Sequence, residues 1–381
     1  MTSDDIPVGR RVASWRVRRQ MTQQMLADRL RRSKSWVDKI ERGARPLDRY
    51  SVIQELAHVL RVEPEALLGQ PRSTPAGTPD GVDDIRAALA RYDIPHAPPQ
   101  TDELRRRVGH AWLTYQHAHY GQLVRLLPGL LDAAQGARSA ELLVQAYRIT
   151  SSLLVKLGEA DLAWLAADRA MAAAHDDPAL AATAAISVGQ ALRASGRDRL
   201  ALAATLAAAN RVRPQRSAGE WAVGGALLLQ AALAAAGCGE HRRADELTDR
   251  AAGVATNLRG YDDQHRTCFG LIAVELTRVL VAASRNDAVE ALRRHSTVVR
   301  REAWRRLPAE YRGAYLVDVA RACLHSGDLR GAARALVDAD SVAPAEVRWR
   351  PVARTLIADV ARAQPAPAGV ARLATLVGLS R

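Results

Sequence analysis

Turn-forming residues recur along most of this chain at a nearly regular spacing. Between residue 101 and the C-terminus they are separated by 37 to 47 positions. They are Gly121, Gly158, Gly196, Gly239, Asn286 and Gly327, with a final break around Ala366. A period of this length predicts stacked pairs of helices, because one pair cannot bury its apolar face without a neighbour. We therefore expect about seven helical pairs over residues 101–381.

Small residues follow these turns at fixed distances. Alanine stands five positions after four of the glycines and again seven positions further on. The positions are Ala163, Ala201, Ala244 and Ala332, then Ala170, Ala208, Ala251 and Ala339. With Gly189 and Pro344, this spacing resembles the tetratricopeptide repeat, in which small residues let the second helix of a pair pack closely against the first. Most of the repeat's usual aromatic residues are missing, so the resemblance implies a degenerate, tetratricopeptide-like α-solenoid.

The composition also favours helices. Aromatic residues make up 4% of the chain, with Phe269 as the single phenylalanine, so the core must be built mainly from Ala, Leu and Val. No run combines β-branched residues with turns at strand spacing, and we expect an all-α protein. Residues 221–239 carry no charge, but Gln230 and the many Ala and Gly residues favour a buried repeat helix over a membrane span.

Positive charge is concentrated near the N-terminus. Residues 9–69 hold 14 Lys and Arg against 7 Asp and Glu, whereas residues 70–381 hold 40 against 32. An Arg-rich composition is by itself typical of a GC-rich genome. A local excess of this kind is what a nucleic-acid-binding domain requires.

Five short helices are predicted within residues 9–69. Thr22 and Ser33 supply N-cap hydroxyl groups for the second and third, and Gly43 suits the end of the third. The fourth is expected near residues 49–60 and the fifth from Pro64. Helices two and three are separated only by two arginines, which is the short turn that presents the second helix of such a pair to the major groove.

The segment from Thr22 onward reads TQQMLADRLRRSKSWVDKIERGARPLDRYSVIQELAHVLRVEPEALLG. It resembles the lambda-repressor-like (Cro/cI, or XRE-type) DNA-binding domain. The matching positions are Thr22, Gln23, Ala27, Leu30, Ser33, Val37, Ile40, Glu41, Arg42, Gly43, Leu56, Ala57, Leu67 and Leu68. Arg32 departs from the pattern, because the family usually has a small apolar residue before the serine. The resemblance implies a five-helix domain that reads DNA with its third helix.

The third helix has two different faces. Val37 and Ile40 are three positions apart and are expected to face the domain core together with Ala27. Polar residues share the opposite face: Lys34, Ser35, Asp38 and Lys39. By the resemblance, these are the positions that touch base edges. Lysine suits O6 and N7 of guanine, and an aspartate can accept a hydrogen bond from N4 of cytosine.

Further residues of the domain are expected at phosphates. The amide of Gln23 would meet a phosphate at the N-terminus of the second helix. The arginine candidates are Arg42, Arg45 and Arg49. For each of these charged or polar residues the alternative is a solvated side chain. Trp36 is expected to be a partly buried packing residue, with stacking on a sugar as the alternative, and Glu41 to be a cap or an ion-pair partner.

Composition also sets the domain boundaries. We expect an N-terminal tail over residues 1–8, the DNA-binding domain over residues 9–69, a linker over residues 70–100 and the repeat domain over residues 101–381. Residues 70–81 are rich in Pro, Gly, Ser and Thr, which is typical of a flexible linker. A short amphipathic helix begins within the linker near Asp83, and packing between the domains is its simplest role.

A solenoid of helical pairs presents the first helix of each pair along a concave groove. The repeat's inner positions give the groove-facing candidates Gln145, Arg148, Ser152, Lys156, Thr183, Gln190, Arg193, Arg321 and His325. This basic, amide-rich set suits the carboxylate and backbone of an acidic or extended peptide. The alternative is a solvated surface that binds nothing small. An apolar face formed by Leu126, Leu127, Leu130 and Leu131 could support dimerisation.

The combined layout resembles the peptide-sensing regulators of Gram-positive bacteria and their actinobacterial relatives. The resemblance implies a cytoplasmic, nucleoid-associated transcription factor that binds double-stranded DNA as a homodimer. Its repeat domain would bind a peptide or small-molecule effector that changes DNA binding. The alternative is an adaptor whose repeats recruit a protein partner, with DNA binding secondary.

Signals for other classes of protein are weak. The motifs GxxxxGK[ST], GxSxG and HExxH do not occur in the sequence, and His110, His117 and His119 have no carboxylates at metal-ligand spacing. The three cysteines are too widely spaced for a zinc site or a disulfide framework. The first residues lack the pattern of a signal peptide. We therefore expect no catalysis, no cofactor, no metal and no membrane partner.

Overall fold

The computed structural model describes residues 8–45, 47, 50–60, 62, 67, 81–92, 100–137, 139–175, 177–212, 217–258, 263, 265–363, 367 and 369–379. Every regular element in these residues is an α-helix, which confirms the predicted all-α class. Several predicted features lie outside the described residues. They are the tail over residues 1–7, Arg49, nearly all of the fifth helix, most of the linker and the break around Ala366.

The described part of the N-terminal domain contains α1 (Val8–Arg18), α2 (Gln23–Arg29), α3 (Lys34–Glu41) and α4 (Tyr50–Leu60). The predicted N-caps of α2 and α3 are confirmed. The hydroxyl of Thr22 accepts a hydrogen bond from the Met25 amide at 3.1 Å, and that of Ser33 accepts one from the Trp36 amide at 3.2 Å. A small core holds the helices together, and its buried members include Val12, Leu26, Ala27, Val37, Ile53, Leu56 and Leu60.

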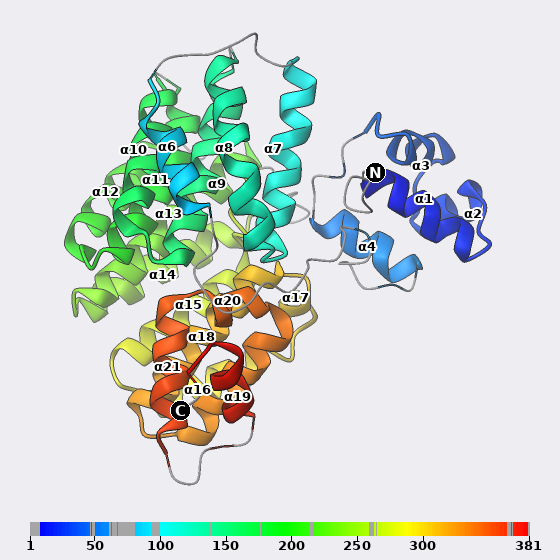
Figure 1. Cartoon of the computed structure of the whole chain (residues 1–381). Helices are drawn as coiled ribbons and strands as arrows, with labels where there is room; N and C mark the ends of the chain where they lie inside the picture. Colours follow the sequence, from blue (N-terminus) through cyan, green and yellow to red (C-terminus); the bar gives the residue numbers. More distant parts are fainter. Residues whose placement is uncertain are drawn as a thin grey trace.

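The rest of the described chain is an array of helices (Figure 1). It begins with α6 (Val82–Ala90) and continues as seven helical pairs in the described residues, the number that was predicted. The pairs are α7 (Thr101–Gln116) with α8 (Tyr120–Gly136), α9 (Ala140–Leu157) with α10 (Ala160–Ala173), α11 (Pro178–Ala194) with α12 (Asp198–Arg211), α13 (Ala218–Gly237) with α14 (His241–Ala255), α15 (Leu271–Ser284) with α16 (Ala288–Val298), α18 (Ala309–His325) with α19 (Leu329–Val342), and α21 (Pro351–Ala361) with α22 (Val370–Leu376). Two short helices, α17 (Glu302–Arg305) and α20 (Pro344–Arg348), stand between pairs.

The turns within these pairs share one backbone feature. In the first six pairs, the residue two positions before the second helix adopts a left-handed conformation, with φ between 57° and 82°. These residues are Ala118, Gly158, Gly196, Gly239, Asn286 and Gly327. Glycine adopts this conformation without steric cost, and asparagine tolerates it better than most other residues. The sequence therefore located five of the six turns correctly.

The prediction of a turn at Gly121 was wrong. The turn lies three residues earlier, at Ala118, and Gly121 is within the first turn of α8. Glycine is needed there for a different reason, because a Cβ atom at this position would lie 2.5 Å from the Trp349 ring. The missing side chain makes room for a tryptophan from the far end of the array.

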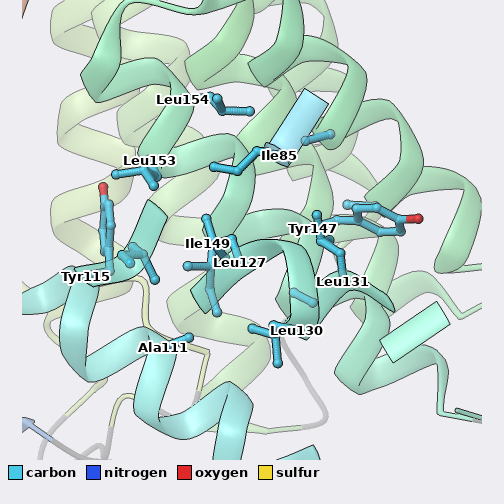
Figure 2. Packing of buried hydrophobic residues seen from close by; sticks show 14 of the residues in the cluster. Ile85, Ala111, Tyr115, Leu127, Leu130, Leu131, Tyr147, Ile149, Leu153 and Leu154 are labelled. Carbon is cyan, nitrogen blue, oxygen red and sulfur yellow. The ribbon is translucent and has the colours of Figure 1, made fainter. Parts of the chain in front are cut away.

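The helix that was assigned to the linker belongs to the core of the repeat domain. Val82, Ile85 and Leu89 of α6 are buried in one hydrophobic cluster with α7, α8 and α9, and Figure 2 shows Ile85 within it. The suggested dimerisation face on α8 was wrong, because three of its four leucines belong to this cluster. Leu127, Leu130 and Leu131 are no more than 5% exposed, whereas Leu126 is 36% exposed.

Small residues bring the paired helices close together, as the repeat pattern predicted. Ala163, Ala201, Ala244 and Ala332 are fully buried. A Cβ atom on Gly189 of α11 would lie 2.3 Å from the methyl group of Thr205 on α12. The apolar helix α13 is long enough to cross a membrane, but 67% of its most apolar window is buried within the array. It is therefore a core helix of the array, as was expected.

The two ends of the array meet through a largely buried group of charged and polar residues. We call Tyr120, Lys156, Glu310, Glu346 and Arg350 the end cluster. Nζ of Lys156 on α9 lies 2.7 Å from Glu346 Oε1 and 3.0 Å from Glu310 Oε2. The hydroxyl group of Tyr120 donates to Glu346, and Arg350 donates to the other oxygen of Glu346 at 3.2 Å. Helices α8 and α9 are thereby joined to α18 and α20.

Candidate DNA-binding site and effector groove

Helix α3 has one buried face and one exposed face. Val37 and Ile40 are each 1% exposed and pack against the other helices of the domain. The side chains of Lys34, Ser35 and Lys39 are exposed on the other side, and Asp38 is half-buried. The N-cap hydroxyl of Ser33 fixes the start of the helix. The structure therefore brings the four predicted base-reading residues together on the outer face of one helix.

Glu41 lies at the end of α3 and joins three helices. Nε of Arg16 on α1 lies 2.6 Å from Glu41 Oε1, and Nε2 of Gln23 on α2 lies 2.9 Å from Glu41 Oε2. Glu41 is 7% exposed, so the ion pair is shielded from solvent. The predicted role of Glu41 as an ion-pair partner is confirmed. The amide nitrogen of Gln23, which was predicted to meet a phosphate, donates to Glu41 in this structure.

The remaining candidates of this domain are at the surface. Asp38 and Arg42 form an ion pair one helical turn apart, so each partly neutralises the charge of the other. Arg45 is exposed beyond the end of α3. Arg32, the departure from the family pattern, has its guanidinium carbon 5.5 Å from the centre of the Trp36 ring. Trp36 itself is half-buried against the domain core, as predicted.

Arg148 does not face an open groove. It is 5% exposed and donates to the carbonyl oxygen of His265 at 3.1 Å. The guanidinium groups of Arg148 and Arg266 both lie over Trp112 of α7, at 5.4 Å and 5.8 Å from the ring centre. Burial lowers the pKa of Arg148 to about 10, which keeps it charged at neutral pH. The segment that precedes α15 therefore occupies this part of the inner surface.

Lys156 and Ser152 are also buried. Lys156 belongs to the end cluster, where burial alone would lower its pKa, but Glu346 and Glu310 outweigh burial and raise it. Ser152, one helical turn earlier on α9, is 7% exposed. These residues and Arg148 share one face of α9, as predicted. That face packs against other segments of the chain.

The other predicted groove residues differ in how they are held. Nη1 of Arg193 donates to Gln230 at 3.1 Å, and burial lowers the pKa of Arg193. The amide of Gln145 donates to Glu141 at 3.3 Å, and the hydroxyl of Thr183 donates to the Leu180 carbonyl at 2.7 Å. Gln190 is half-buried, while Arg321 and His325 are exposed. The candidates therefore do not form one continuous accessible surface.

Comparison with known proteins bears on the N-terminal domain. A family model described as a helix-turn-helix domain matches residues 7–68. This part of the chain is a helix-turn-helix domain. A comparison with curated proteins gives no match. Among solved structures, the chain is similar to Bacillus thuringiensis PlcR in complex with the peptide PapR7 and DNA, with 11% identity, a TM-score of 0.41 and coverage of 77% of this chain and 94% of that chain.

The helix-turn-helix domain rests on the array through the side opposite α3. Leu113 of α7 is 2% exposed and packs in the same hydrophobic cluster as Val12 and Leu56 of the domain. Nε2 of Gln54 on α4 donates to the Arg305 carbonyl of α17 at 3.1 Å. Figure 1 shows α4 beside α17, with α2 and α3 further from the array. The exposed face of α3 therefore remains open to solvent in this arrangement.

The contacts between the two domains were not predicted from sequence. Leu113 lies among the apolar residues of α7, and nothing in the local pattern separates it from the residues that face α8. Gln54 is 251 positions from its partner Arg305. From Ala111 to Tyr115, apolar residues are interrupted only by Thr114, and this run is the one signal that α7 is covered on more than one side.

Proposed function

We propose that this chain is a transcriptional regulator that binds specific DNA sequences through α3. The observation that carries the proposal is the exposed face of this helix. Lys34, Ser35 and Lys39 project from a capped helix whose opposite face is buried, within a segment that matches a helix-turn-helix domain. In domains of this kind the second helix of the motif lies in the major groove. Lys34 and Lys39 are then the residues that contact guanine, with Ser35 and Asp38 beside them.

DNA binding by variants of α3 tests the proposal. Operator fragments would come from DNA upstream of the chain's own coding sequence, and affinity would be measured by gel shift at several salt concentrations. Lys34→Ala or Lys39→Ala should weaken specific binding by about tenfold to a hundredfold, because each removes a base contact. Arg242→Ala is a matched control, since it removes one positive charge from an exposed site on α14.

The salt dependence of DNA binding distinguishes base contacts from phosphate contacts. Loss of a phosphate contact reduces the slope of log affinity against log salt concentration by about one, whereas loss of a base contact lowers specificity. Arg42→Ala and Arg45→Ala are expected to act mainly on that slope. If Lys34→Ala and Lys39→Ala bound the operator as well as the unaltered chain does, α3 would not be the reading helix.

We further propose that the repeat domain dimerises and binds a peptide or other small effector that changes DNA binding. The support is the contact of the helix-turn-helix domain with α7 and α17, through which a change in the array can reach α3. Half-sites one helical turn apart are what a two-fold dimer reads. Native mass spectrometry of the chain from its own cells measures both the subunit number and the mass of any bound molecule. The adaptor alternative would be favoured by two results together. A protein would co-purify with the chain, and the α3 variants would bind DNA as well as the unaltered chain does.

A further inference from the structure

A pocket of about 290 Å³ lies where the first turns of α11 and α13 meet the end of α12. Its apolar wall is formed by Pro178, Ala179, Ala182, Val212 and Val223. Three polar residues complete the lining: Arg211, Glu220 and His265. A mostly apolar pocket with a few polar groups is the usual form of a small-molecule site, and this volume is at the small end of the range.

Among the lining residues, Glu220 gives the strongest indication of a ligand. Its Oε2 atom is buried and has no hydrogen-bond partner within the described part of the chain. A buried polar atom without a partner costs free energy, so such atoms are rare unless a ligand or water satisfies them. The backbone amide of Glu220 is already bonded to the Ser217 hydroxyl at 3.2 Å. Because Glu220 also lines the pocket, its carboxylate suits a ligand that donates hydrogen bonds.

The other polar groups around the pocket do not oppose a bound cation. The first backbone amides of α11 are bonded to Asp177, at 2.8 Å for Ala179 and 3.1 Å for Leu180, so they are not available to an anion. Burial and the nearby Arg148 lower the pKa of His265, so its ring is neutral at neutral pH. Glu220 is then the charged group that a buried ligand atom meets.

Arg211 lies at the last position of α12 and is exposed. Within the described residues, no ion pair joins Arg211 to Glu220 or to another carboxylate. Its guanidinium can therefore receive a carboxylate at the mouth of the pocket, where solvent weakens the interaction. The lining thus combines a carboxylate with a buried oxygen, an exposed guanidinium group and aliphatic side chains.

We propose that this pocket binds a small aliphatic zwitterion, with its ammonium group at Glu220, its carboxylate at Arg211 and its apolar body against Val212 and Val223. The inference rests on the proposed function, because it identifies the effector site of the repeat domain. His265 connects the pocket to Arg148 of α9. It lines the pocket, and its carbonyl oxygen accepts a hydrogen bond from the Arg148 guanidinium group. A ligand that shifts His265 therefore acts on the inner face of α9.

Three probes with the same branched body separate the two charges. They are leucine, 3-methylbutylammonium, which lacks the carboxylate, and 4-methylpentanoate, which lacks the ammonium group. Binding to the full chain would be measured by calorimetry without DNA. We expect leucine to bind about tenfold more tightly than 4-methylpentanoate, because the buried contact to Glu220 is lost. The loss for 3-methylbutylammonium should be smaller, about threefold, because Arg211 is exposed.

Two variants assign each contact to its residue. In Glu220→Gln, leucine should no longer bind more tightly than 4-methylpentanoate. Leucine should still bind more tightly than 3-methylbutylammonium. Arg211→Ala should do the reverse. Glu246→Gln, at an exposed carboxylate of α14 that pairs with Arg242, is the matched control and should change neither ratio. Circular dichroism of each variant confirms that the helices remain folded.

Equal binding of leucine and 4-methylpentanoate, or a Glu220→Gln chain with an unchanged preference, would overturn the proposal. Binding of none of the three probes would overturn it as well. The DNA-binding assays on the α3 variants are independent of these titrations. A failed titration with intact operator binding therefore removes the effector site and leaves the regulator, whereas the opposite result removes the regulator.

Discussion

Glu41 shows how a single carboxylate can hold α3 in place. It is buried, it is paired with Arg16 of α1, and it accepts a hydrogen bond from Gln23 of α2. Three helices thus meet at one side chain. Because the pair is shielded, removing one partner leaves the other as an uncompensated buried charge.

Replacing Glu41 with alanine is therefore expected to lower the free energy of opening of α1 to α3 by about 3–5 kcal/mol. Native-state hydrogen exchange would measure this helix by helix, and amides of the repeat domain should exchange at unchanged rates. Glu55→Ala, at an exposed carboxylate of α4, is the control. The double variant Arg16→Met with Glu41→Leu should recover part of the loss. Equal protection in Glu41→Ala and the control would show that the ion pair does not hold the helices.

Residue roles were predictable where a short segment decides them. The inward direction of Val37 and Ile40 follows from spacing on one helix, and the caps at Thr22 and Ser33 follow from residue type. The fate of Arg148 and Lys156 could not be derived in this way. Spacing placed both on one face of α9, but Arg148 meets a segment 117 positions away. Such partners depend on how the whole array curves.

At the level of helices, one repeat pattern can hide two different uses of glycine. Gly158 and Gly196 lie at turns and adopt positive φ. Gly121 lies inside α8, where its missing Cβ admits the ring of Trp349. The periodic spacing alone does not distinguish these cases, which is why the turn at Ala118 was missed. The role of α6 was missed for a similar reason, since its short apolar face gives no indication of which helix it covers.

Alanine substitutions on α8 test the close contact. Gly121→Ala should destabilise the chain by about 1–3 kcal/mol, because the added methyl group overpacks against Trp349. Gly129→Ala is a matched control on the same helix, where a Cβ atom would meet no atom within 4 Å. It should be neutral or stabilising by up to about 1 kcal/mol. Thermal unfolding followed by circular dichroism measures both, and a similar shift for the two variants would contradict the contact.

For the whole molecule, the end cluster makes stability depend on pH. Burial raises the pKa of Glu310, and Lys156 opposes that rise. A carboxyl group with a raised pKa binds its proton more tightly in the folded chain, so folding gains relative stability as pH falls through that pKa. Without Lys156 the opposing charge is gone, and this effect should be larger.

Lys156→Met is therefore expected to cost about 3–5 kcal/mol at pH 7, because Glu310 and Glu346 lose their buried partner. The deficit should shrink when urea unfolding is repeated at pH 5. Lys39→Met, which removes an exposed lysine from α3, should be close to neutral at both pH values. A deficit that stayed constant between pH 5 and pH 7 would contradict the assignment of these charges.

The contact between the two ends of the array has a consequence for synthesis on the ribosome. Tyr120 and its partner Glu346 are 226 residues apart. Translation adds about 5–20 residues per second, so roughly 10 to 45 seconds pass between the synthesis of Tyr120 and that of Glu346. During that time the nascent first pairs carry an unfinished surface with Tyr120 and Lys156 uncovered. The interval defines when a chaperone would be most useful to this chain, and when a neighbouring nascent copy would be most harmful.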